Sequence, residues 1–416
     1  MNFFYSEYFT YKNNELYCED IPLTEIAKDV STPVYVYSKK FFTDRYFEFE
    51  NAFKSVKHKI FYASKANYNI QVIKHFHNLG AGIDVNSEGE FLRAIKAGVP
   101  PEDMLLTGVG KTDEEIKLGI ENNVKLIKAE SLEEIYVINN IAKSLKKTAP
   151  LAIRVNPNVD PETHPYISTG LAENKFGIDE TLAFEIFKTA SKLSNVKLTG
   201  IDMHIGSQIT TVQPFVDALE KIVNLTLELK DSGIKLEHID IGGGIGVRYE
   251  NEKTFTPKNL ADAIIPILEK TDCEVYFEPG RFLTANGGCL VTKVLYTKTN
   301  LDKNFIVVDA AMTDLLRPSI YKAYHHIQPV KKIHNEDITA DIVGPVCESG
   351  DFLGKSRIIT KPQRDDLIAI MSAGAYGMVM SSNYNGRRRP AEVLVDENKF
   401  KVIRKRETYN QLTINE

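Results

Sequence analysis

The sequence predicts an α/β protein in which a (β/α)8 TIM barrel is joined to a mostly antiparallel β-sheet domain. Up to Phe277, short β-rich runs alternate with helix-like stretches. Such alternation favours parallel strands, because parallel neighbours need a crossover connection between them. After Phe277 the alternation stops, and β-rich segments follow one another with few long helices between them. That second pattern is typical of an antiparallel sheet.

Eight strands are expected in the alternating part, and this number of units over roughly 240 residues matches the usual size of a closed barrel. An open, doubly wound sheet is the alternative, but eight units favour closure. The expected strands lie at 60–64, 82–85, 104–107, 125–128, 151–155, 198–204, 238–241 and 274–277. Amphipathic, helix-like stretches between them include 69–77, 88–97, 112–122, 132–144, 181–191 and 214–232.

The β domain is expected from the later β-rich segments, with a contribution from the start of the chain. The first thirty-odd residues are also strand-like, and we expect them to pair with this sheet. The predicted boundaries are therefore an N-terminal segment at 1–35, the barrel at 36–280 and the β domain at 281–416. The β-rich segments are 288–299, 304–309, 338–344, 366–371 and 391–404.

Composition excludes several classes of protein. A chain of 416 residues is long for one domain and comfortable for two, and 43% apolar with 26% charged residues is typical of a soluble globular protein. A net charge of −5 gives no reason to expect nucleic acid or an anionic membrane as a partner. No signal peptide or membrane-spanning run is indicated. The cysteines at 18, 273, 289 and 347 have no metal-ligand spacing, so we expect a cytoplasmic protein with reduced thiols and no metal.

The C-terminal ends of barrel strands usually carry the active site, and the first two strands end in notable residues. Lys65 follows the first strand, where its amine could form a Schiff base with an aldehyde cofactor. Asp84 ends the second strand and could orient that lysine. Taken alone, Lys65 is more readily explained as a surface lysine, and Asp84 could belong to a helix start where Ser87 and Glu90 form a capping box.

The later strand ends strengthen this interpretation. His204 and Ser207 follow the sixth strand, so an imidazole could stack on a flat cofactor and a hydroxyl could reach a phosphate. The glycine run at 242–246 follows the seventh strand, and barrels of this kind commonly bind phosphate after strands seven and eight. The eighth strand ends in Glu278-Pro-Gly-Arg281. This carboxylate could keep a pyridine nitrogen protonated, and the arginine could bind phosphate or carboxylate.

Together with three motifs in the β domain, these residues resemble the fold-type III pyridoxal-phosphate decarboxylases, and among them the diaminopimelate decarboxylase family. The likeness covers nearly the whole chain in the same order, and the family's architecture is a (β/α)8 barrel plus a β domain. Its most telling segment is His-Pro-Tyr-Ile-Ser-Thr-Gly at 164–170, followed by Asn-Lys-Phe-Gly-Ile at 174–178. The β-domain motifs are Arg-Pro-Ser-Ile-Tyr at 317–321, Cys-Glu-Ser-Gly-Asp at 347–351 and Ser-Asn-Tyr-Asn at 382–385.

The resemblance implies pyridoxal 5'-phosphate as the cofactor and assigns a role to each matching residue. Lys65 is similar to the Schiff-base lysine, His204 to the residue that stacks on the cofactor ring, and Cys347 to the general acid. Glu278 matches the partner of the pyridine nitrogen. The remaining cofactor contacts that it implies are Asp84, Ser207, Gly242, Gly243, Gly244, Pro279, Gly280, Arg281 and Tyr376. The substrate contacts that it implies are Arg281, Arg317, Tyr321, Glu348 and Tyr376.

The activity implied is decarboxylation of meso-2,6-diaminopimelate to L-lysine and CO2, the last step of lysine biosynthesis. The far end of this amino-acid substrate carries an ammonium and a carboxylate. Glu348 could hold the ammonium, and Arg281, Arg317 and Tyr321 could hold the carboxylate. A site with such buried polar partners rejects substrates that lack the matching groups. The resemblance also implies a homodimer with shared active sites, in which the neighbouring subunit brings the Cys347–Glu348 segment.

Three alternatives remain open from the sequence. An amino-acid racemase would need a second base facing Lys65, and the Cys-Glu-Ser-Gly segment argues against it. A polyamine-pathway decarboxylase acting on ornithine, arginine or carboxynorspermidine would share Lys65 but would not need Arg317 and Tyr321. An inactive homologue should have lost Lys65 or Cys347, and both residues are present.

Overall fold

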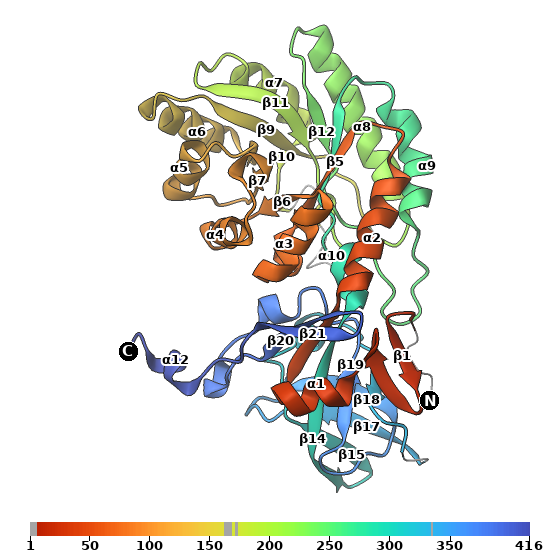
Figure 1. Cartoon of the computed structure of the whole chain (residues 1–416). Helices are drawn as coiled ribbons and strands as arrows, with labels where there is room; N and C mark the ends of the chain where they lie inside the picture. Colours follow the sequence, from red (N-terminus) through yellow and green to blue (C-terminus); the bar gives the residue numbers. More distant parts are fainter. Residues whose placement is uncertain (1–5, 162–168, 171–173, 334–335) are drawn as a thin grey trace. The chain divides into compact units, whose positions relative to one another are not determined.

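A computed structural model describes residues 6–161, 169–170, 174–333 and 336–416 (Figure 1). The chain divides into two compact units. One consists of Arg45–Val247 with Lys253–Phe282, and the other of Met1–Asp44, Arg248–Glu252 and Leu283–Glu416. Most of the family-like segment at 164–170 lies outside the described residues. No helix within the described ranges is long and apolar enough to cross a membrane.

The first unit is a closed barrel of eight parallel strands, which confirms the predicted fold class and all eight predicted strands. Closure is seen in the pairing of β13 with β5 and of β8 with β9. A short additional strand, β10 (Ile178–Asp179), pairs with β9. In order around the ring the strands are β5 (His58–Ala63), β6 (Gly82–Val85), β7 (Met104–Leu106), β8 (Leu126–Ala129), β9 (Ala149–Asn156), β11 (Val196–Asp202), β12 (His238–Asp240) and β13 (Glu274–Phe277).

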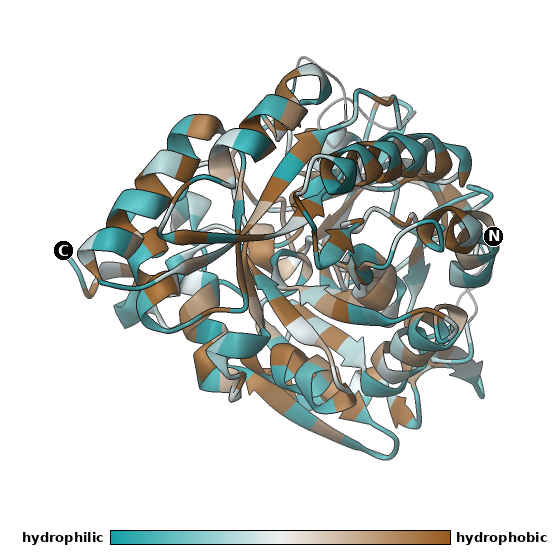
Figure 2. Cartoon of the chain, turned by 90° about the horizontal axis from the view of Figure 1, so that it is seen from above, coloured by the Kyte–Doolittle hydropathy of each residue, from teal (hydrophilic) through white to brown (hydrophobic). Residues whose placement is uncertain are grey.

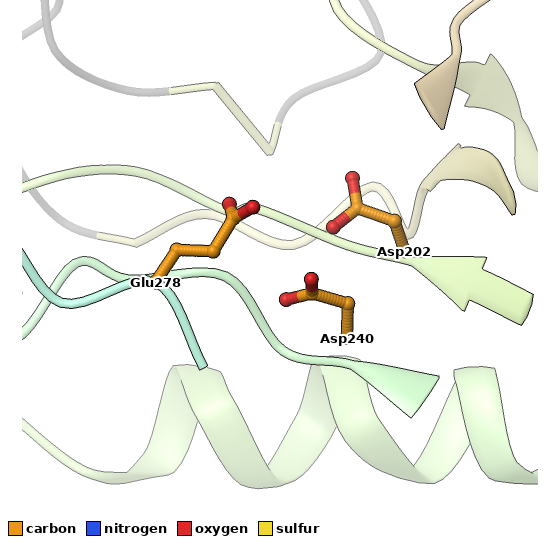
Figure 3. A group of neighbouring side chains, drawn as sticks. All are labelled: Asp202, Asp240 and Glu278. Carbon is orange, nitrogen blue, oxygen red and sulfur yellow. The ribbon is translucent and has the colours of Figure 1, made fainter. Parts of the chain in front are cut away.

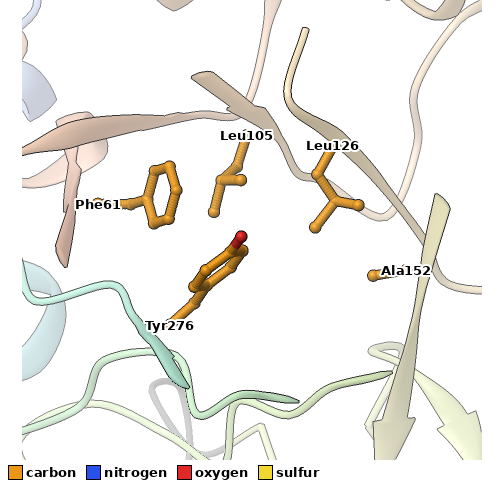
Figure 4. Packing of buried hydrophobic residues seen from close by; sticks show 5 residues of the cluster. All are labelled: Phe61, Leu105, Leu126, Ala152 and Tyr276. Atoms are coloured by element: carbon orange, nitrogen blue, oxygen red, sulfur yellow. The ribbon is translucent and has the colours of Figure 1, made fainter. Parts of the chain in front are cut away.

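A packed core fills the barrel. Parallel strands covered on both faces are apolar almost throughout, because neither face meets water. Five strands each contribute one side chain to a buried cluster of Phe61, Leu105, Leu126, Ala152 and Tyr276 (Figure 4). Interiors of barrels of this type are filled by such layers of side chains, so any chemistry must take place at the strand ends rather than inside the ring.

Amphipathic helices connect the barrel strands, and Figure 2 shows brown apolar and teal polar residues interleaved along them. Six of them match stretches predicted from the sequence. Most begin at a polar residue whose side chain accepts a backbone N–H of the first turn, for example Asn69 and Thr112. The helices are α2 (Lys39–Ala52), α3 (Ile70–Leu79), α4 (Glu88–Ala97), α5 (Asp113–Glu121), α6 (Leu132–Ser144), α7 (Glu180–Ala190), α8 (Gln213–Asp231) and α9 (Pro257–Leu268).

The capping box predicted at the start of α4 forms only in part. Ser87 Oγ accepts the N–H of Glu90 at 3.3 Å, as predicted. The Glu90 carboxylate, however, accepts from the backbone N–H of Asn86 at 2.8 Å and from the Ser64 hydroxyl at 2.9 Å. The reciprocal half of the prediction is therefore wrong, because Glu90 instead fastens the turn after β5 to the end of β6.

The second unit is built on a mixed sheet. Most of its strand pairs are antiparallel, as predicted, but β15 with β17 and β20 with β4 are parallel pairs. The N-terminal part contributes β4, which lies between β14 and β20, whereas β1 (Phe9–Lys12), β2 (Glu15–Cys18) and β3 (Ile21–Pro22) form a small sheet of their own. The large sheet runs β18 (Phe352–Thr360), β17 (Asp337–Val343), β15 (Lys303–Val308), β14 (Gly288–Asn300), β4 (Val34–Ser38), β20 (Ala391–Asp396) and β21 (Lys399–Arg404), with β19 (Leu367–Ile370) on β14 and β16 (Ile327–Pro329) on β19.

Candidate active site

Lys65 lies in a short 3-10 turn, Ser64–Ala66, that directly follows β5. The pairing of β5 with β6 sets Ala63 opposite Asp84, so the end of β6 lies beside this turn. Lys65 Nζ is 3.5 Å from Asp84 Oδ2, and the side chain of Asp84 is fully buried while that of Lys65 is 35% exposed. The second oxygen of Asp84, Oδ1, is buried without a hydrogen-bond partner. A fixed carboxylate therefore orients a reachable amine at the barrel end.

His204 follows β11 and is held as a neutral imidazole. Its Nδ1 accepts the backbone N–H of Gly243 at 3.1 Å, so this nitrogen carries no proton. Burial lowers the pKa of His204 well below its usual value, and the positive charges of Lys65, Arg154 and Lys128 lower it further. The sequence singled out this histidine, and the structure adds its link to the glycine run.

The glycine run after β12 is packed so tightly that side chains would not fit. Gly242 and Gly244 have φ values of +71° and +110°, which favour glycine. A Cβ on Gly243 would lie 2.3 Å from the backbone oxygen of Glu278. The N–H of Gly242 donates to Asp240 Oδ1 at 2.8 Å, and that of Gly243 donates to His204. Of the three glycines named for phosphate, Gly244 is therefore the best placed to donate its N–H to a ligand.

The segment after β13 connects the glycine run to the lysine turn. Pro279 accepts the N–H of Ala63 at 3.2 Å, and a Cβ on Gly280 would lie 2.9 Å from the Cβ of Ala66. The buried guanidinium of Arg281 donates from Nε and Nη2 to Ser207 Oγ, at 3.1 and 2.9 Å. A guanidinium, a hydroxyl and a glycine turn at barrel strand ends make a set of donors that suits a phosphate group.

Glu278 belongs to a buried cluster that the sequence interpretation missed (Figure 3). Its Oε1 lies 2.6 Å from the ammonium of Lys128, which is also 2.7 Å from Asp202 Oδ1 and 2.7 Å from Asp240 Oδ2. Burial and the nearby Asp240 raise the pKa of Glu278 well above its usual value. The signal in the sequence was a charged residue at or near the end of three of the predicted barrel strands, where burial on both faces should exclude charge.

The second unit holds the remaining candidates, and its own contacts bring three motifs together. Arg317 is the first residue of α11 (Arg317–Tyr321) and is buried. Its Nη1 lies 2.9 Å from Nε2 of His325. Ser319 Oγ donates to the Gly350 carbonyl at 2.6 Å, which fastens α11 to the 347–351 loop. The backbone N–H of Cys347 donates to Asn385 Oδ1 at 2.8 Å, which adds the 382–385 motif.

The exposure of these candidates differs. Cys347 and Glu348 are exposed, whereas Tyr321 and Tyr376 are half-buried. Tyr376 has φ +54°, a left-handed backbone conformation that is uncommon for residues other than glycine. The guanidinium of Arg317 lies 4.5 Å from the centre of the Tyr249 ring. Arg317 is therefore a fixed cation, and the thiol and carboxylate at 347–348 are accessible.

The residues at the barrel ends fit an aldehyde cofactor that carries a phosphate. They supply an amine at Lys65, a neutral imidazole at His204 and a carboxylate at Glu278. Donors for an anion come from Ser207, Gly244 and Arg281. The close packing of the glycine turn supports this fit. A Cβ on Gly244 would lie 2.5 Å from the Gly206 carbonyl, so this position of the turn requires glycine.

Comparison with known proteins gives consistent results. Residues 40–285 match the family described as pyridoxal-dependent decarboxylase, pyridoxal binding domain. The chain is 46% identical to a diaminopimelate decarboxylase of Aquifex aeolicus, over 98% of this chain and 97% of that protein. It is 46% identical to one of Neisseria meningitidis serogroup B, over 96% and 97%. A crystal structure of diaminopimelate decarboxylase from Helicobacter pylori complexed with L-lysine is 40% identical, covers 94% of this chain and 98% of that chain, and superposes with a TM-score of 0.91.

Proposed function

The chain belongs to the diaminopimelate decarboxylase family of pyridoxal-dependent decarboxylases, and from this premise we propose that it converts meso-2,6-diaminopimelate to L-lysine and CO2, the last step of lysine biosynthesis. The cofactor is pyridoxal 5'-phosphate. The observation that carries the substrate assignment is the extent of the likeness, which spans 98% of the chain. It includes both the barrel with Lys65 and the second unit with Arg317 and Cys347.

The barrel residues divide the work of holding the cofactor. When bound, pyridoxal phosphate supplies an aldehyde for the substrate amine and a ring that accepts the electrons released as CO2 leaves. Lys65 would hold the cofactor through its amine, which can bond to an aldehyde. Asp84 Oδ2 lies 3.5 Å from this amine. Its carboxylate holds the amine beside the end of β6 and pairs with the ammonium form of Lys65 between turnovers.

The other barrel residues fix the ring and the phosphate. Glu278 would hold the ring nitrogen in its protonated form, which would strengthen the ring as an electron acceptor. His204 would pack against the ring as a neutral imidazole, since its Nδ1 accepts the N–H of Gly243. Arg281, Ser207 and Gly244 would donate to the phosphate, and Arg281 and Ser207 are already held together by a hydrogen bond of 2.9 Å.

The second unit supplies substrate recognition and the final proton. Arg317 and Tyr321 bind the distal carboxylate, and Glu348 binds the distal ammonium. Cys347 delivers a proton from Sγ to the carbon that has lost its carboxylate. The exposed thiol of Cys347 can reach a second copy of the chain, and in the proposed homodimer the 347–348 segment completes the neighbour's site.

Measurement of CO2 release from meso-diaminopimelate, ornithine, arginine and lysine tests this proposal. We expect rapid release from meso-diaminopimelate and little from the other three, because they lack a distal carboxylate for Arg317. The product from meso-diaminopimelate should co-chromatograph with L-lysine. Faster release from ornithine or arginine would overturn the substrate assignment and favour a polyamine-pathway decarboxylase.

A further inference from the structure

Lys128, in β8, is a fully buried cation surrounded by carboxylates from three other parts of the barrel. Its Nζ lies 2.7 Å from Asp202 at the end of β11 and 2.7 Å from Asp240 at the end of β12. It lies 2.6 Å from Glu278, which follows β13. Figure 3 shows the three carboxylates turned toward one another. They therefore share one counter-charge, and Lys128 supplies it.

The ammonium takes the place that a metal ion could otherwise fill. Ligand oxygens of Asp202, Asp240 and Glu278 lie within 4.8 Å of one another, a spacing that could hold a cation. Lys128 Nζ is already in contact with all three, so the positive charge at this point is part of the chain. Buried carboxylates without a partner are strongly disfavoured, which is why such a cluster needs its own cation.

We propose that Lys128 is a positioning residue for the cofactor's ring nitrogen, because its ammonium fixes the Glu278 carboxylate at the barrel end and favours the ionised form of that carboxylate. This inference deepens the proposed function and rests on the role of Glu278 in it. Lys128 is the one cation in contact with Glu278 among the residues that the structure describes. Without it, Glu278 would face Asp202, Asp240 and Asp84, and would take up a proton. A protonated Glu278 is a weak partner for a positively charged ring nitrogen.

Two further hydrogen bonds connect Lys128 to the glycine run. Asp240 Oδ1 accepts the N–H of Gly242 at 2.8 Å, while Asp240 Oδ2 contacts Lys128. The N–H of Glu278 donates to the Gly242 carbonyl at 2.7 Å. Lys128 thus holds the carboxylate proposed for the ring nitrogen in register with the turn proposed for the phosphate. A neutral side chain of similar length could fill the space but could not hold both carboxylates.

The pKa of Glu278 is raised well above its usual value overall, and within that balance Lys128 acts against protonation. Burial and Asp240 raise the pKa of Glu278, and Lys128 is the neighbour that lowers it. Burial raises the pKa of Asp240 to about 6, and Lys128 again opposes the rise. Burial alone would lower the pKa of Lys128, but the carboxylates outweigh this and raise it, so the ammonium keeps its charge. The other charged or titratable groups around the cluster are Lys65, Asp84, Arg154, His204 and His238.

Three variants separate a charge role from a space-filling role. Lys128→Met removes the ammonium, and Lys128→Arg keeps a cation. Lys111→Met is the matched control, because Lys111 is also buried in the barrel but pairs with Glu134 at 2.7 Å, away from Glu278. In cofactor-free protein at neutral pH, the infrared band of a protonated carboxyl should grow in Lys128→Met and stay at the parent level in the other two.

Nitrogen-15 NMR with ring-labelled pyridoxal phosphate gives a second readout that does not depend on turnover. We expect the bound ring nitrogen of Lys128→Met to lose its proton at a pH lower than in the parent by about one unit or more, because a protonated Glu278 no longer offers the negative charge that favours the protonated nitrogen. Lys128→Arg should restore most of the shift. Parent-like resonances and no additional protonated carboxyl in Lys128→Met would mean that Lys128 only fills space, and would overturn the inference.

Two more variants keep the test decisive. If Lys128→Met does not fold, the double variant Lys128→Met with Asp202→Asn removes one anion together with the cation, and it should show the same two changes. Parent-like spectra in the folded double variant would overturn the inference. Glu278→Gln should also move the ring-nitrogen titration. If it does not, the proposed role of Glu278 fails together with this inference, whereas failure of the substrate assay alone leaves both spectroscopic results valid.

Discussion

At the scale of single residues, Lys65 illustrates how position gives a common side chain its function. Lysines at protein surfaces are numerous, but this one lies in a turn fastened by Ser64 to Glu90 and by Ala63 to Pro279. Its amine meets Asp84 at 3.5 Å. The sequence could suggest the residue because it follows a strand. It could not supply the contacts of this turn with Glu90 and Pro279, since these depend on how the chain folds around the barrel.

We predict that Lys65→Ala binds no cofactor covalently. Without the amine, no bond to the aldehyde carbon can form, so the visible absorbance of the lysine-linked cofactor should disappear and CO2 release should fall to background. Borohydride reduction of the parent followed by peptide mapping should label the peptide that contains Lys65. Lys111→Ala should keep the absorbance, because that buried lysine pairs with Glu134 elsewhere. A label on another lysine would show that the anchor is misassigned.

Arg317 is predicted to determine the choice of substrate. Its guanidinium is fixed by His325 at 2.9 Å and lies against Tyr249. His325 Nδ1 is 2.9 Å from the Met371 carbonyl and must donate to it, so Nε2 accepts from the arginine. Arg317→Met should lower kcat/KM for meso-diaminopimelate by about 100-fold or more, because loss of a buried charged partner costs about 2–5 kcal/mol.

The control for this prediction is a second arginine that stacks on a tyrosine. Arg388 lies 4.4 Å from the centre of the Tyr409 ring, almost the same geometry as Arg317 on Tyr249. Arg388→Met should leave kcat/KM within error of the parent. Equal losses in both variants would point to a general effect on folding rather than to recognition of the distal carboxylate.

His238 is predicted to make the barrel sensitive to acid. It is buried and stacked on Tyr276, with ring centres 4.5 Å apart, and burial lowers its pKa to about 3. In the unfolded chain its pKa returns to about 6.5. The stability that it contributes is therefore complete above about pH 6.5 and is lost as the pH falls toward 3, since only the unfolded state takes up the proton.

His238→Phe should remove this part of the acid sensitivity. Between roughly pH 6 and 4, the free energy of unfolding of the parent should fall by about 1.4 kcal/mol per pH unit more than that of the variant. At pH 8 the two proteins should differ only by a constant offset, which serves as the internal control. Parallel curves over the whole range would contradict the assignment. Denaturant unfolding at a series of pH values provides the measurement.

At the scale of elements, the glycine run shows how packing and chemistry are combined in one turn. Gly243→Ala should lower the free energy of unfolding by about 1–3 kcal/mol, the usual cost of forcing an extra carbon into a packed site. The new Cβ would lie 2.3 Å from the Glu278 carbonyl. Cofactor affinity should fall with it, because the turn after β12 and the end of β13 would move apart.

Gly110→Ala is the matched control for that variant. Nothing lies within 4 Å of a Cβ at this position, so the substitution should be neutral. Thermal unfolding and cofactor titration of both variants test the prediction. If Gly243→Ala unfolds and binds cofactor like the parent, the glycine run is not held as tightly as its contacts indicate.

How far the sequence can predict the elements depends on how local their causes are. The eight barrel strands and six helices were predictable because hydrophobic period and cap residues act within a few positions. The hydrogen-bond partners of the Glu90 carboxylate could not be predicted, since the N–H of Asn86 and the hydroxyl of Ser64 compete for it with the backbone N–H of Ser87. The two parallel pairs in the second unit were also missed, because pairing between β4 and β20 joins opposite ends of the chain.

The site divides in the same way. Lys65, His204 and Glu278 could be predicted, because each stands directly after a strand and belongs to a recognisable motif. Lys128, Asp202 and Asp240 were missed, although each is a charge at or near the end of a predicted barrel strand. Their meaning appears only when β8, β11 and β12 are placed around the ring, where three anions and one cation meet.

At the scale of the whole molecule, the proposed homodimer can be tested by mixing two inactive variants. Lys65→Ala lacks the cofactor anchor, and Cys347→Ala lacks the proton donor. If Cys347 serves the neighbour's site, a mixed dimer contains one site with both residues intact and one site with neither. Random reassortment makes half of the dimers mixed, so about a quarter of the parent activity should return. If each subunit used its own Cys347, no site in the mixture would be complete and no activity would return.

CO2 release measured after unfolding and refolding the two variants together, against each refolded alone, distinguishes the two arrangements. Gel filtration of the same samples reports whether dimers formed, so the absence of recovery in a dimeric mixture would contradict the shared site.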